Sequence, residues 1–88
     1  MNEILAFLAL FNCVPTDNIV IDDSLDRPGY YYHQSHAVHI KSNASKSVLV
    51  HELYHSCQLK PTNQAESDLN EREAHYVERV WFYNHRGD

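Results

Sequence analysis

Basic side chains are scarce in this sequence. Its 88 residues contain seven Lys and Arg against twelve Asp and Glu, which gives a net charge of −5. A protein that binds nucleic acid through the phosphate backbone needs clustered positive charge, and no stretch of this chain forms a basic stripe. We therefore expect no nucleic-acid partner.

Long apolar segments are lacking too. The N-terminal run MNEILAFLALFNCV, residues 1–14, is too short to span a bilayer. Glu3 stands where a signal peptide carries positive charge, and no small-residue cleavage site follows. The sequence therefore predicts no membrane partner and favours the cytoplasm, with a secreted or periplasmic location as the alternative.

Cysteine is also rare, since Cys13 and Cys57 are the two in the chain. Two Cys without C-x-x-C spacing are too few for a disulfide scaffold. We interpret Cys57 as a small buried hydrophobe on the apolar side of a helix. A Cys13–Cys57 bridge is the alternative if the protein is exported.

The residues that are abundant indicate a folded domain with a possible metal site. Hydrophobic residues make up 43% of the chain, which argues against disorder. We expect residues 1–88 to form one domain, near the lower size at which a hydrophobic core suffices. A bound metal could add stability to so small a core. Seven His are the compositional outlier and fit metal chemistry.

Local patterns predict an α+β fold. Residues 3–13 read as a short apolar helix with Asn2 as its N-cap. The β-branched run at 19–21 and the segments 30–33 and 37–41 read as short strands. These spacings predict a small, mainly antiparallel sheet of about three strands.

Two helices are expected in the second half of the chain. The first begins at the N-cap candidates in 42–45 and runs to about Leu59, since Pro61 forbids its continuation. The second begins near Asn63 and ends before Gly87. Its apolar stripe is expected at Leu69, Tyr76, Val77, Val80 and Tyr83.

The motif H-E-x-x-H occurs at residues 51–55, within the first of these helices. His51 and His55 are four residues apart, so both imidazoles project from one face and can reach the same ion. Glu52 lies about 100° around the helix, where it is better placed to take a proton from a metal-bound water than to act as a ligand. The motif therefore predicts a Zn²⁺ site with Glu52 as a general base.

A catalytic zinc site needs a third protein ligand, and the second long helix supplies the candidates. Glu71 lies 16 residues after His55, far enough for the chain to turn and return antiparallel. Glu73 is the rival, but its wheel position falls towards the expected apolar stripe. We therefore favour Glu71 over Glu73.

These residues resemble a known class of enzymes. H-E-x-x-H followed by N-E on a second helix, here Asn70-Glu71, resembles the gluzincin class of zinc metallopeptidases. The E-x-E-A form at 71–74 also resembles short phage and bacterial zincin-like proteins, as does Gln58. The resemblance covers residues 48–78. It implies that Glu71 is the third ligand and that His75 either hydrogen-bonds a ligand side chain or is itself an alternative ligand, although such families usually carry Asp at that position.

The resemblance implies a zincin-like fold and hydrolysis of peptide bonds in a peptide or protein substrate. The metal would activate a water, with Glu52 as the general base. Candidate donors to the developing oxyanion are Tyr54, Tyr76, His75 and the cluster at 30–33. The strand at 37–41 could bind an extended peptide along its edge. The alternative function is a catalytically inactive zinc-binding module with a regulatory or interaction role.

Overall fold

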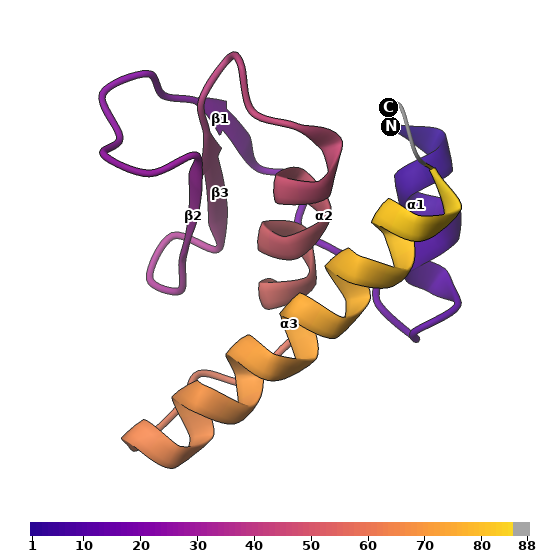
Figure 1. Ribbon diagram of the computed structural model, residues 1–88. Helices are drawn as coiled ribbons and strands as arrows, with labels where there is room; N and C mark the ends of the chain where they lie inside the picture. The colour runs from indigo at the N-terminus through magenta and orange to yellow at the C-terminus, as the bar shows by residue number, and fades with distance from the viewer. Residues whose placement is uncertain (86–88) are drawn as a thin grey trace.

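The computed structural model describes residues 1–85 and shows a small α+β fold (Figure 1). Its elements are α1 (Asn2–Ala9), β1 (Ile19–Ile21), β2 (Gly29–Tyr32), β3 (Ala37–Ile40), α2 (Lys46–His55) and α3 (Gln64–Asn84). Helix α2 lies between the sheet and α3, and α1 packs against the C-terminal half of α3. The predicted fold class is confirmed.

The sheet is mixed, whereas a mainly antiparallel sheet was expected. Its strand order is β1-β3-β2, with β3 parallel to β1 and antiparallel to β2. Ala37, Val38 and Ile40 are all buried, and a strand this apolar is stabilised by neighbours on both sides. The prediction that 37–41 offers a free edge is therefore wrong, and β2 is the edge strand beside α2.

The core is built around α2, which packs against the sheet on one side and against α1 and α3 on the other. Its largest fully buried side chains include Trp81, Leu8, Leu53 and Val38. The buried face of α3 consists of Ala74, Val77 and Trp81, and it is narrower than the predicted apolar stripe. Three members of that stripe are exposed, namely Leu69, Tyr76 and Tyr83. The small side chain of Ala74 permits close helix packing, which turns the neighbouring polar face of α3 towards α2.

A disulfide joins Cys13 to Cys57, across 44 positions in sequence. The interpretation of Cys57 as a buried hydrophobe is wrong: the residue is exposed, and α2 ends at His55 instead of continuing to about Leu59. Beside the bridge, the Thr16 backbone N–H donates to Ser56 Oγ at 3.0 Å. The segment after α1 is therefore tied twice to the turn that follows α2.

Side-chain caps define where α2 and α3 begin. Ser45 Oγ accepts from the Val48 backbone N–H at 3.3 Å, and Asn63 Oδ1 accepts from the Glu66 N–H at 2.9 Å. Both caps were among the predicted candidates. The expected stop signal of α3, Gly87, lies outside the described residues.

Helix α1 is shorter than the predicted 3–13. It ends at Ala9, and its N-cap is Met1, which makes no side-chain capping bond, instead of Asn2. Within residues 1–85, none of the helices combines the length and the apolar character needed to cross a membrane.

Candidate metal centre

A cleft of about 490 Å³ opens between β2, α2 and the N-terminal half of α3. Helix α2 contributes His51, Glu52 and His55, the three defining residues of the H-E-x-x-H motif, to it. The cleft is lined by Arg27, Pro28, Gly29, Tyr30, Tyr31, His33, His51, Glu52, His55, Pro61, Ser67, Asn70 and Glu71. The motif predicted from the sequence therefore faces a cavity that a small ligand or an extended segment could enter.

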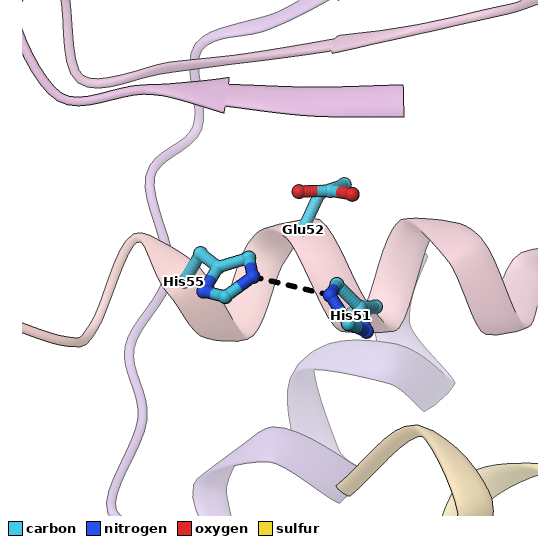
Figure 2. A group of neighbouring side chains, drawn as sticks. All are labelled: His51, Glu52 and His55. Carbon is cyan, nitrogen blue, oxygen red and sulfur yellow. Dashed lines mark hydrogen bonds between the residues drawn. The ribbon is translucent and has the colours of Figure 1, made fainter. Parts of the chain in front are cut away.

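Three potential ligand atoms converge in this cleft. The Nε2 atoms of His51 and His55 are 3.1 Å apart (Figure 2). Glu71 Oε1 lies 2.6 Å from His55 Nε2 and 3.4 Å from His51 Nε2. Tetrahedral zinc with ligands at about 2.0–2.1 Å requires ligand atoms roughly 3.3 Å apart. The spacing of the three atoms is close to what a single ion needs.

The second nitrogen of each imidazole is held by a hydrogen bond. His51 Nδ1 lies 2.7 Å from Glu78 Oε1, and His55 Nδ1 lies 2.7 Å from Gln58 Oε1. The orientation of the Gln58 amide is fixed because its Nε2 donates to the Asn70 carbonyl at 2.9 Å. Both Nδ1 atoms therefore face acceptors and carry the proton in the neutral tautomers.

These tautomers leave a lone pair on each Nε2, pointing at the other and at the Glu71 carboxylate. Three acceptor atoms this close repel one another unless a cation lies among them. Burial disfavours the charged form of the Glu71 carboxyl, but the positive charge that His55 and His51 carry when protonated lowers the pKa of this carboxyl below its usual value. The cluster of His51, His55 and Glu71 is therefore suited to hold a metal ion.

Glu52 leaves the helix on another side and points towards the sheet (Figure 2). A Cβ added to Gly29 would lie 3.2 Å from Glu52 Cγ, so the bare glycine lets α2 and β2 approach at this carboxylate. Burial raises the pKa of Glu52, while the nearby His51 and His55 lower it. Its ligand atom lies within 4.8 Å of those of both histidines. A water that binds beside the two imidazoles would therefore lie within reach of the Glu52 carboxylate.

Glu73, the rival candidate ligand, and His75 lie on α3 outside the group of three converging ligand atoms. Glu73 is exposed and accepts from Gln58 Nε2 at 3.1 Å, so it supports the residue that orients His55. His75 is also exposed, with its nitrogens 3.7 Å from Glu71 Oε2 and 3.5 Å from Glu78 Oε1. The geometry thus favours Glu71 over Glu73 as a ligand. It places His75 beside the carboxylates of Glu71 and Glu78.

Tyr54 and Tyr76 are not placed to act as oxyanion donors. Both rings contact Phe11, with centroids 6.4 and 6.5 Å away, and neither residue lines the cleft. Phe11 follows α1 and packs against the core, which draws these aromatic rings away from the site. Of the cluster at 30–33, Tyr30, Tyr31 and His33 line the cleft, and the Tyr31 hydroxyl is paired with His36 Nδ1 at 2.6 Å.

Sequence reasoning missed the role of Glu78. This residue is seven positions after Glu71, so it lies on the same face of α3 two turns later. That periodicity was a usable signal, because a ligand His commonly donates its second ring N–H to a carboxylate. No sequence feature marked Arg27, Pro28 and Gly29 as part of the cleft.

Comparison with known proteins gives no relative for this chain. No protein family matches it, no characterised protein is similar to it in sequence, and no solved structure matches its fold. The functional assignment therefore depends on the geometry of the site.

Replacing Glu78 with Gln is expected to weaken metal binding by about 10- to 100-fold, because His51 loses the carboxylate that orients its ring and raises its basicity. Competition with a chromogenic chelator measures the affinity. Asp68→Asn, an exposed acid on the same helix but outside the cleft, is the control and should bind metal as the wild type does. Equal affinities for the Glu78→Gln variant and the control would remove Glu78 from the site.

Proposed function

We propose that this protein is a zinc-dependent hydrolase of peptide bonds. The observation that carries the proposal is the convergence of His51 Nε2, His55 Nε2 and Glu71 Oε1 within 3.4 Å, beside the carboxylate of Glu52. Two imidazoles and one carboxylate form a ligand set that zinc peptidases use, and it leaves a coordination position open.

The surroundings of the three ligands support zinc in particular. Zinc binds neutral imidazole nitrogen and carboxylate oxygen, and each imidazole here has its Nδ1 hydrogen-bonded to an oxygen acceptor. When bound, zinc would polarise a substrate carbonyl and lower the pKa of a water ligand to about 7.

Glu52 is the residue proposed to move the proton. As general base it takes a proton from the attacking water, and as general acid it returns that proton to the leaving amine. Burial of the carboxyl, which raises its pKa, favours this second step because it makes the protonated form more accessible. Tyr30 and His33, which line the same cleft, are the donors available to the developing oxyanion.

The edge strand β2 supports a peptide as the substrate. It pairs with β3 on one side only, and its residues Gly29 to Tyr31 line the cleft beside Glu52. The unpaired backbone groups of an edge strand can hydrogen-bond an extended peptide. Binding of a peptide along a strand edge was expected for 37–41, whereas we now assign it to β2.

The disulfide favours an oxidising compartment over the cytoplasm. Bonds such as Cys13–Cys57 persist in secreted and periplasmic proteins and are rare where thiols are kept reduced. We therefore propose that the protein functions after export, which was the alternative location expected from the sequence.

Metal analysis of two single variants tests the proposed site. Glu71→Gln removes the proposed ligand, while Glu73→Gln removes an acid two positions away. Glu73 is linked to the site only by an exposed hydrogen bond to Gln58, whose amide the Asn70 carbonyl also holds. We expect the wild type and Glu73→Gln to bind one zinc per chain. Glu71→Gln should lose affinity by about 100-fold or more, since a ligand matters at least as much as its supporting residues. Equal affinities for the two variants would contradict the proposal.

A further inference from the structure

Arg27 lies in the cleft, close to the residues proposed to act in hydrolysis. It precedes β2 by two residues and is the single Lys or Arg among those that line the cleft within the described chain. The other acidic and imidazole side chains there are His33, the His51–His55–Glu71 cluster and Glu52. Arg27 is therefore the one permanently positive side chain available to a bound substrate.

The guanidinium of Arg27 is oriented but not neutralised by a close partner. It lies over the ring of Tyr30, with its Cζ 5.1 Å from the ring centroid. Its Nε is 3.6 Å from Asp26 Oδ1, and Asp26 is 93% exposed, so this contact is weak. Within residues 1–85 the two terminal amino groups have no hydrogen-bond acceptor. Such a fork is suited to a carboxylate that binds through two parallel hydrogen bonds.

The position of Arg27 limits which part of a peptide it can reach. Gly29 lies against Glu52, and Arg27 stands two residues before it, in the bend that leads into β2. Two residues of chain span at most about 7 Å. A peptide running along β2 would place a side chain or terminus one to three residues from the scissile bond beside Arg27.

We propose that Arg27 selects peptides that carry a carboxylate at this distance from the bond that is cleaved. The inference rests on the proposed function, since it names the substrate class of the same site. The carboxylate has two possible sources, an acidic side chain or the C-terminus of the peptide. Both present the same planar anion to the guanidinium.

Peptide binding to the zinc-loaded Glu52→Gln variant tests the inference without requiring turnover. The probes are blocked pentapeptides that carry Glu or Gln at each position in turn, and one unblocked pentapeptide with a free C-terminal carboxylate. NMR titration gives the dissociation constants. We expect one acidic peptide to bind about five- to tenfold more tightly than its neutral match. Preference for an internal Glu identifies a side chain, and preference for the free acid identifies a terminus.

Substitutions at Arg27 decide whether this residue causes the preference. Arg27→Gln should remove it, while Arg27→Lys should keep part of it because charge remains without the planar fork. Lys46→Gln, an equal charge change at an exposed residue outside the cleft, should leave it intact. A preference that survives in Arg27→Gln, or equal binding of all the peptides, would overturn the inference. Failure to retain zinc would instead contradict the proposed function, and the titration of the same sample would still report on Arg27.

Discussion

The Glu52→Gln variant is expected to lose hydrolysis of a peptide library by about 10²- to 10⁴-fold while retaining its zinc. The amide has nearly the same shape as the carboxylate but cannot accept a proton from the attacking water. Glu52 leaves α2 on a different side from His51 and His55 (Figure 2), so the substitution should not disturb these two ligands. The proposed third ligand, Glu71, approaches both imidazoles independently of Glu52. Quenched-fluorescence assays and metal analysis of the same preparation measure both quantities.

Glu3→Gln is the matched control for this variant, because it removes one negative charge from an exposed residue on α1. It should hydrolyse peptides as the wild type does. If zinc binds but neither the wild type nor the Glu52→Gln variant hydrolyses any peptide, the protein is better described as a zinc-binding module. If wild type and variant hydrolyse peptides equally well, Glu52 is not the general base.

Loss of the Cys13–Cys57 bridge is expected to lower the free energy of unfolding by about 4 kcal/mol, because the bridge closes a loop spanning 44 positions in the unfolded chain. For a domain of this size the melting temperature should fall by about 20 °C. Denaturant unfolding of the oxidised wild type and of Cys57→Ser, both saturated with zinc, measures the difference.

A reductant separates the bridge from other effects of the substitution. Adding it should destabilise the wild type and leave Cys57→Ser unchanged, since the variant has no disulfide to lose. Equal stability of the oxidised wild type and the variant would show that the bridge adds little. Such a result would also remove the support that the bridge gives to an exported protein.

The parts of the site that lie within one helix could be predicted from the sequence. His51 and His55 share a face because of helical periodicity alone, and the same rule places Glu52 to one side. Glu71 could be favoured over Glu73 because the two residues take different positions on the wheel of one helix. The orientation of that helix relative to α2 could not be predicted. The Ser45 and Asn63 caps could be found from local chemistry.

Features that depend on contacts between distant segments could not be predicted in this way. The parallel pairing of β1 with β3 joins strands separated by β2, and local alternation does not reveal strand order. The exposed side chains of Tyr76 and Leu69 showed that periodicity fixes the helix but not which neighbours cover its face. Cys57 was misinterpreted because pairing with Cys13 requires α1 to lie beside the end of α2.

X-ray absorption at the zinc edge, on protein loaded with one equivalent of zinc, tests the central claim most directly. The predicted spectrum has two imidazole ligands together with oxygen ligands from a carboxylate and water, and it should lose one imidazole in His51→Ala. Stoichiometric zinc with sulfur ligands, zinc bound by water alone, or a spectrum unchanged in His51→Ala would contradict the account.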